Sequence, residues 1–327
     1  MYKANSSRYD GTMPYIRCGN SGLKLPRISL GLWHNFGNSA SQEEAGKILK
    51  AAFDAGITHF DLANNYGYPA GSAESNFGEL FRKNFIPYRD EIIVSTKAGF
   101  GMWPGPYGDG SSRKYLLASL DQSLKRMGLD YVDIFYSHRY DGETPIEETV
   151  MALSKAVQSG KALYVGLSNY PVEKAREAID MLHSEKIPYI IYQGRYNIMD
   201  RSAEDGMFQM LQEKGSGFIA YCVLAQGLIS DRYLSGIPAG SRAADPHGYL
   251  QTSDVKEEVI NRMRRLNEIA ASRGQSLAQM AFAWVLHNNN VTTALTGVSS
   301  LAQLQSNLQA LRNTSFSEEE LMEICNR

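Results

Sequence analysis

The chain has 327 residues, 43% of them hydrophobic, which is enough to build a sizeable buried core. Its 33 basic and 35 acidic residues nearly balance, so no basic surface for nucleic acid is expected. No apolar run reaches the length of a transmembrane helix, and the polar N-terminal segment lacks the apolar core of a signal peptide. We therefore expect a cytoplasmic protein that binds neither nucleic acid nor a membrane.

The cysteines and histidines show no disulfide or metal pattern. Cys18, Cys222 and Cys325 are scattered and include no CxxC pair. The six histidines have no HExxH or other metal spacing. We therefore expect reduced thiols and no bound metal.

Short apolar runs alternate with amphipathic stretches along the chain. The runs are near-continuously apolar, which is typical of parallel strands that are buried on both faces. The predicted strands are residues 28–32, 58–63, 92–98, 131–138, 162–169, 189–193, 217–224 and 293–298. Eight strands at intervals of about 30 residues, each followed by a helix, predict an α/β fold of the (β/α)8 TIM barrel type. An open doubly wound sheet, the alternative, usually carries a glycine-rich phosphate loop that residues 31–37 do not match.

Segments between the strands add detail to this barrel. Residues 15–17 and 23–25 flank a turn and predict an N-terminal hairpin that caps the barrel floor. Two long loops, residues 99–112 after the third strand and 225–252 after the seventh, are expected to act as lids or substrate walls. Since no linker is present, we expect a single domain over residues 1–327.

Three helix starts have the pattern of a capping box. In Thr144-Pro145-Ile146-Glu147 we expect Thr144 as the N-cap and proline at the first helical position. Ser41 with Glu44 and Ser317 with Glu320 have the same spacing.

Four polar residues stand at the ends of neighbouring strands. Asp61, Lys97 and His138 lie at the carboxyl ends of three apolar runs, and Tyr66 follows in the loop after Asp61. In a (β/α)8 barrel this end carries the active site. A nearby ammonium is expected to lower the pKa of the Tyr66 phenol, with Asp61 holding Lys97 and His138 orienting a substrate oxygen.

Each of these residues also has a structural interpretation. An aspartate can cap a helix or form an ion pair, and a tyrosine can simply pack in the core. A histidine can be a core residue whose hydrogen bonds are all made within the protein. Lys97 is the exception, since a lysine at the end of an apolar strand is costly to bury without a partner. No nucleophile elbow is present, so electrons for carbonyl reduction would come from an organic cofactor.

Several long motifs resemble the aldo-keto reductase superfamily across nearly the whole chain. They are GITHFDLANNYG, STKAG, LDYVDIFYSHR, VGLSNY, YQGRYN and GVSSLAQLQSNLQAL. Residues 102–139 are similar to a branch that contains bacterial L-glyceraldehyde 3-phosphate reductases and voltage-gated potassium channel β subunits. The resemblance implies that Tyr66 is the general acid, that Asp61 and Lys97 tune it, and that His138 orients the carbonyl.

The resemblance also implies NADP(H) as cofactor and a set of residues that bind it. Ser168, Asn169 and Gln193 match positions that bind the nicotinamide amide, and Tyr221 matches the stacking aromatic. The other implied cofactor positions are Trp33, Asp61, Leu224, Gln226, Arg232, Arg242, Gly297, Ser299, Gln303 and Asn307. Relatives carry Ser/Thr-Pro where this chain has Cys222-Val223, and Asp231 stands beside Arg232.

The implied function is NADPH-dependent reduction of small aldehydes, such as methylglyoxal or glyceraldehyde 3-phosphate, in detoxification or triose repair. Trp33, Tyr66, Trp103 and His138 are expected to line the substrate site, with Arg113 or Arg139 for a phosphate. Close relatives assemble, so the resemblance points to a homo-oligomer, while the residues themselves leave the oligomeric state open.

Two other functions are open. A nucleotide-sensing subunit with little turnover resembles the channel β subunits, although those compared have asparagine at the position of His138. A lyase that forms a Schiff base on Lys97 would leave the cofactor motifs unexplained.

Overall fold

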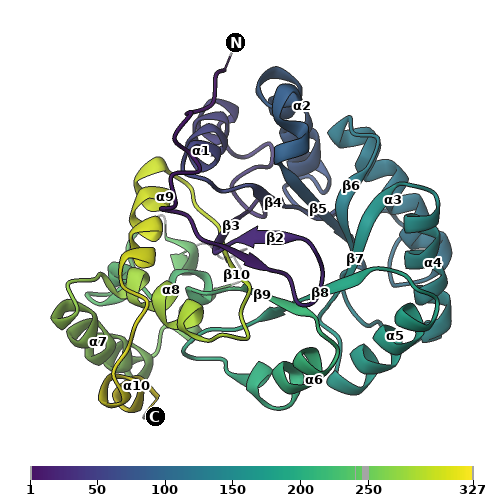
Figure 1. Cartoon of the computed structure of the whole chain (residues 1–327). Coiled ribbons are helices and arrows are strands. Elements are labelled where there is room, and N and C mark those ends of the chain that lie inside the picture. The colour runs from purple at the N-terminus through teal and green to yellow at the C-terminus, as the bar shows by residue number, and fades with distance from the viewer. Residues whose placement is uncertain (1, 240, 245–249, 326–327) are drawn as a thin grey trace.

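The chain folds into a closed barrel of eight parallel strands, with helices packed around it (Figure 1). The computed structural model describes residues 2–239, 241–244 and 250–325. The barrel strands are β3 (Ile28–Gly31), β4 (His59–Asp61), β5 (Ile93–Ala98), β6 (Val132–Ser137), β7 (Ala162–Ser168), β8 (Tyr189–Arg195), β9 (Gly217–Tyr221) and β10 (Thr293–Thr296). Since β10 pairs with both β3 and β9, the sheet has no open edge, and the predicted (β/α)8 barrel is confirmed.

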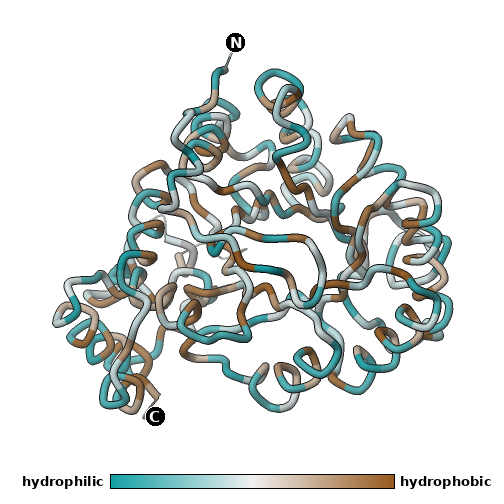
Figure 2. The backbone as a smooth tube through the Cα atoms, in the orientation of Figure 1, coloured by the Kyte–Doolittle hydropathy of each residue, from teal (hydrophilic) through white to brown (hydrophobic). Residues whose placement is uncertain are grey.

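Helices connect successive strands and cover the outside of the barrel (Figure 1). They are α1 (Gln42–Asp54), α2 (Ser72–Asn84), α3 (Arg113–Met127), α4 (Ile146–Gln158), α5 (Val172–Ser184), α6 (Met207–Glu213), α7 (Glu257–Ser272), α8 (Leu277–His287), α9 (Leu301–Leu308) and α10 (Glu318–Cys325). Hydrophobic stretches follow the strands at the centre of the ring, and hydrophilic stretches predominate in its outer turns (Figure 2). This distribution agrees with strands that are buried on both faces.

A short hairpin closes the amino end of the barrel. It consists of β1 (Tyr15–Arg17) and β2 (Lys24–Pro26), which pair antiparallel and cross the centre of the ring of strands (Figure 1). Cys18 and Leu25, both fully buried, pack against isoleucines of the barrel interior. The predicted hairpin is confirmed, with its second strand one residue later than expected.

The helix starts confirm two of the three predicted N-caps. Ser41 accepts from the backbone N–H of Glu44, and Ser317 and Glu320 form a reciprocal capping box. The prediction of Thr144 as an N-cap is wrong. Pro145 occupies the N-cap position, and Asp141 instead accepts from both the backbone N–H and the hydroxyl of Thr144, at 2.9 and 2.7 Å.

Both predicted long loops follow the strands named for them. Residues 99–112 connect β5 to α3. The loop after β9 contains short 3-10 helices η3 (Ala225–Gly227), η4 (Asp231–Tyr233), η5 (Arg242–Ala244) and η6 (Thr252–Asp254). Residues 240 and 245–249 of this loop lie outside the described part of the chain. Within the part described, no helix is long and apolar enough to span a membrane.

Candidate active site

An ion pair lies inside the barrel at the carboxyl ends of β4 and β5. Lys97 Nζ lies 2.6 Å from Asp61 Oδ2, and both side chains are almost completely buried, at 0% and 1% exposure. The ammonium also donates to the carbonyl oxygen of Leu62, at 2.6 Å. Burying both charges is tolerable only because each is paired and hydrogen-bonded.

The second carboxylate oxygen of Asp61 is held by two neutral donors. Ser95 Oγ donates to Asp61 Oδ1 at 2.6 Å, and Gln193 Nε2 donates to the same oxygen at 3.1 Å. Gln193 comes from β8, so Asp61 connects strands that are distant in the sequence. The orientation of this carboxylate is therefore determined from three sides.

Tyr66 and His138 lie side by side next to the ion pair. Their ring centroids are 5.9 Å apart, and Lys97 Nζ lies 5.0 Å from the centre of the Tyr66 ring. Among the described residues, neither the Tyr66 hydroxyl nor the imidazole of His138 has a hydrogen-bond partner. The structure thus brings all four predicted residues together and leaves a phenol and an imidazole available to a ligand.

The pKa of Tyr66 in the structure differs from the sequence-based expectation. Burial raises the pKa of Tyr66 well above its ordinary value, and the Asp61 carboxylate adds to this effect. The prediction of a lowered pKa for the Tyr66 phenol is therefore wrong for this structure. Desolvation outweighs the ammonium, which donates to Asp61 and Leu62.

The pKa values of the two basic groups, His138 and Lys97, are shifted downward. Burial lowers the pKa of His138 well below its ordinary value, and the charges of Lys97 and Arg139 add to the effect. Burial also lowers the pKa of Lys97, although the Asp61 carboxylate raises it. His138 is therefore a neutral imidazole at neutral pH, with a single ring N–H.

Asp61, Tyr66, Lys97 and His138 are called the tetrad below. The ends of β7 and β9 form a hydrogen-bonded rim beside it. Asn169, which has a positive φ of 56°, donates through Nδ2 to the His138 carbonyl oxygen and to Ser168 Oγ. Its Oδ1 accepts from the Tyr221 hydroxyl at 2.6 Å. Three predicted nicotinamide residues, Ser168, Asn169 and Tyr221, are therefore in one network, while Gln193 faces Asp61.

The segment after β9 has an unusual backbone. Cys222, Ala225 and Gln226 all have positive φ, which is uncommon for residues other than glycine and is concentrated at functional sites. Gln226 Oε1 is buried without a hydrogen-bond partner among the described residues. Leu224 packs against the core beside them.

The other predicted cofactor residues lie around the same end of the barrel or are engaged within the protein. Trp33 follows β3, with its ring 6.3 Å from that of Tyr66. Ser299 donates to the side chain of Gln303, and Asn307 is buried and donates to Thr296. Gly297 directly follows β10.

Two arginines of the implied cofactor set lie in the loop after β9. Arg232 is exposed in η4. Arg242 lies in η5, and its side chain is outside the described part of the chain.

The substrate side contains an aromatic residue that sequence analysis missed. Phe100 lies edge-to-face against His138, at 4.7 Å between ring centroids, whereas Trp103 packs against Tyr115. Phe100 directly follows STKAG, so its position just beyond the strand end was the available signal.

The two candidate phosphate-binding arginines of the substrate side differ in their surroundings. Arg139 donates to the Gly99 carbonyl oxygen and pairs with Asp109 at 3.0 Å. Arg113 is exposed at the start of α3. Arg139 is therefore tied to the loop after β5, beside His138.

Two further residues near the tetrad were missed. His59 and Ser95 are fully buried in the barrel and lie two positions before Asp61 and Lys97. Since alternate residues of a strand share a face, this spacing was the signal that could have found them.

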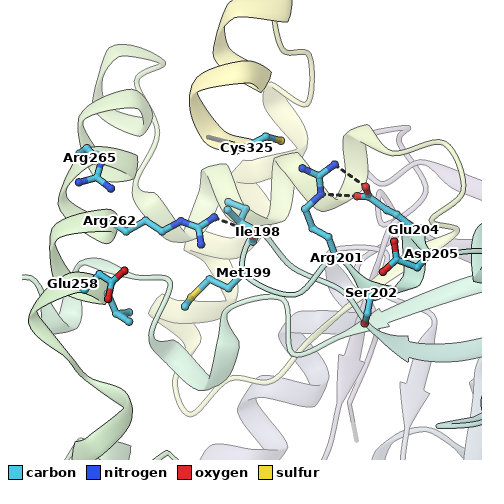
Figure 3. Close-up of a pocket in the computed structure, with 11 residues that line it drawn as sticks. Ile198, Met199, Arg201, Ser202, Glu204, Asp205, Glu258, Arg262, Arg265 and Cys325 are labelled. Carbon is cyan, nitrogen blue, oxygen red and sulfur yellow. Dashed lines mark hydrogen bonds and ion pairs between the residues drawn. The ribbon is translucent and has the colours of Figure 1, made fainter. Parts of the chain in front are cut away.

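A cavity of about 630 Å³ lies elsewhere, between residues 198–205, α7 and Cys325 (Figure 3). Arg201 pairs with Glu204 there, and Arg262 donates to the Ile198 carbonyl oxygen. Its lining contains three arginines and three acidic residues, so it has no charge bias, and it includes none of the predicted site residues.

Comparison with known proteins identifies the family. Residues 27–326 match the family described as "Aldo/keto reductase family". The chain is 56% identical to L-glyceraldehyde 3-phosphate reductase of Escherichia coli strain K12 and to that of Escherichia coli O157:H7, over 99% of this chain and 94% of each relative. It is 36% identical to a probable voltage-gated potassium channel subunit beta of Oryza sativa subsp. japonica, over 91% of each chain. The chain therefore belongs to the aldo/keto reductase family of oxidoreductases.

Proposed function

We propose that this protein reduces small aldehydes to primary alcohols with NADPH, and that L-glyceraldehyde 3-phosphate is among its substrates. The observation that carries the proposal is the pair formed by Tyr66 and His138. These two groups lie together beside a buried Lys97–Asp61 pair and have unused hydrogen-bonding capacity. A carbonyl oxygen is the acceptor that a phenol and a neutral imidazole can both serve.

In this proposal Tyr66 donates the proton. Its raised pKa keeps the phenol protonated, and Oη passes the proton to the carbonyl oxygen as the carbonyl carbon accepts hydride. The tyrosinate left behind lies close to the Lys97 ammonium, which stabilises it. His138 donates its single N–H to the same oxygen and so orients the aldehyde.

The residues of the rim fit a nicotinamide dinucleotide. Gln226 Oε1 is a buried acceptor without a described partner, and Tyr221 offers a partly exposed ring for stacking. Bound NADPH supplies the hydride. Ser168, Asn169 and Gln193 would hold its amide, with the segment 297–307 at the adenosine phosphate, where Ser300 caps the start of α9.

The substrate assignment draws on the relatives and on one cation. A relative with 56% identity is named for L-glyceraldehyde 3-phosphate. Arg139 follows His138 directly and is the cation that we assign to the phosphate, with Phe100 as an apolar wall. Methylglyoxal, which has no phosphate, would be reduced without help from Arg139.

The test follows the loss of NADPH absorbance with L-glyceraldehyde 3-phosphate and with methylglyoxal. We expect turnover by the wild type and a loss of at least about 100-fold in kcat for Tyr66→Phe, because the proton donor is removed. Tyr68→Phe is the matched control, since Tyr68 lies two residues away and is 81% exposed. Full activity of Tyr66→Phe would contradict the proposal. NADPH binding without turnover by the wild type would instead indicate a nucleotide-sensing subunit.

A further inference from the structure

A row of buried hydroxyl and imidazole groups leads from β10 to Asp61. Thr293 Oγ1 lies 2.8 Å from Ser29 Oγ, which lies 2.9 Å from Nδ1 of His59. Nε2 of the same ring lies 2.9 Å from Ser95 Oγ, and Ser95 donates to Asp61 Oδ1 at 2.6 Å. None of the five side chains is more than 1% exposed, so water does not compete for these bonds.

Strand geometry places this row inside the barrel. His59 precedes Asp61 by two residues on β4, and Ser95 precedes Lys97 by two on β5. Alternate residues share a face, so both polar residues point to the interior, as the ion pair does. A buried polar group is costly unless it is bonded, and each ring nitrogen of His59 has one partner.

The direction of the hydrogen bonds follows from counting protons. Asp61 accepts from Lys97 and Gln193, as an ionised carboxylate does, and has no proton to give. The single hydroxyl proton of Ser95 is therefore directed at Asp61, so Ser95 Oγ must accept from His59. This requires that the ring proton of His59 is on Nε2.

The same counting extends to the far end of the row. Burial lowers the pKa of His59 to about 4, so the ring is neutral and has one proton. With Nε2 protonated, Nδ1 accepts from the Ser29 hydroxyl, and Ser29 Oγ accepts from Thr293. All four bonds then run in one direction, toward Asp61, and hydrogen bonds aligned in this way strengthen one another.

We propose that His59, held as the Nε2–H tautomer, is a positioning residue that acts through Ser95 to keep the Asp61 carboxylate oriented toward Lys97. Its effect on turnover rests on the proposed function, since Lys97 matters there through Tyr66. The direction of the row is a property of the folded protein alone.

The first test reads the tautomer and needs no activity. Two-bond ¹H–¹⁵N correlation spectra of the histidine rings, with His59 assigned from a His59→Gln variant, are expected to show a neutral ring protonated on Nε2. In Ser95→Ala the Nε2 proton loses its acceptor, so we expect it to move to Nδ1, where Ser29 accepts it. An Nδ1–H ring or an imidazolium in the wild type would overturn the proposal.

The second test measures turnover. We expect Ser95→Ala to lower kcat about tenfold, as loss of one hydrogen bond to a charged group does, with the aldehyde KM unchanged within twofold. Ser95→Thr keeps a hydroxyl and should recover most of kcat. In His59→Gln, adding Ser95→Ala should cause little further loss, because both changes break the same row.

The matched control is Ser154→Ala on α4. Ser154 is also buried and donates to a carboxylate, that of Glu185, at the same distance of 2.6 Å. Its loss should leave kcat unchanged. Wild-type kcat in Ser95→Ala, or an equal loss in Ser154→Ala, would overturn the positioning role. A wild type without turnover would refute the proposed function, and the tautomer in wild type and Ser95→Ala would then decide this inference alone.

Discussion

Two lysine–aspartate pairs of equal length allow the effect of burial to be measured. Lys97 and Asp61 are 2.6 Å apart, as are Lys161 and Asp121. The first pair is 0% and 1% exposed, and the second is 41% and 57% exposed. At this distance the attraction is roughly 6 kcal/mol at an effective dielectric constant of 20 but roughly 2 kcal/mol in water. The buried pair should therefore respond far more strongly to the loss of one partner.

We expect Lys97→Met to lower the free energy of unfolding by about 3–5 kcal/mol, because it leaves the Asp61 carboxylate buried and uncompensated. Lys161→Met should cost less than about 1 kcal/mol, because Asp121 stays hydrated. Equilibrium urea unfolding followed by far-ultraviolet circular dichroism measures both. The double variant Lys97→Met/Asp61→Asn has no charge at either position. Its loss of unfolding free energy should be smaller than the sum of the losses in the two single variants.

Two results would refute this reasoning. One is a cost for Lys97→Met within about 1 kcal/mol of that for Lys161→Met. The other is a double variant whose loss equals the sum of the single losses, since that would mean that Lys97 and Asp61 do not interact.

Three further predictions concern pH, packing and capping. Burial lowers the pKa of His59 from 6.5 to about 4, so between those pH values only the unfolded chain binds this proton. The free energy of unfolding should therefore fall by about 3 kcal/mol as the pH falls through that range. The fall should be smaller in His59→Gln. Gly166→Ala would place a methyl 2.4 Å from the Tyr136 ring and should cost about 1–3 kcal/mol in urea unfolding, whereas Gly101→Ala, with open space, should cost little. Ser276→Ala removes the capping box of α8 and should lower the unfolding free energy by about 1 kcal/mol; an unchanged urea midpoint would contradict this role.

The barrel was predictable because its strands carry a strong local signal. All eight predicted runs are strands, although β9 ends at Tyr221 rather than at 224 and β8 continues to Arg195. The N-cap of α4 was not predictable, because it depends on how Asp141 in the preceding turn binds the backbone N–H and the hydroxyl of Thr144. A single domain over 1–327, a cytoplasmic location and a homo-oligomer stay predictions.

The candidate site was predictable in its members and not in its electrostatics. The polar residues at strand ends identified Asp61, Lys97 and His138 because parallel strands share one carboxyl edge. The direction of the pKa change at Tyr66 was wrong, because it depends on how far the phenol is desolvated. Phe100 was missed, because the contact of a loop residue with His138 depends on how the loop folds back.

Local patterns in the chain were enough to predict the succession of strands and helices, the amino-end hairpin and the chemical groups at the strand ends. These follow from local periodicity and from strand polarity, which are properties of short segments. Two other features depend on the closed barrel. Gln193 of β8 and Ser95 of β5 meet on one oxygen of Asp61, and His59 is linked through hydroxyl groups to Thr293. Those contacts exist because the barrel closes between β10 and β3, which surrounds the interior residues with partners from distant strands and excludes water from them.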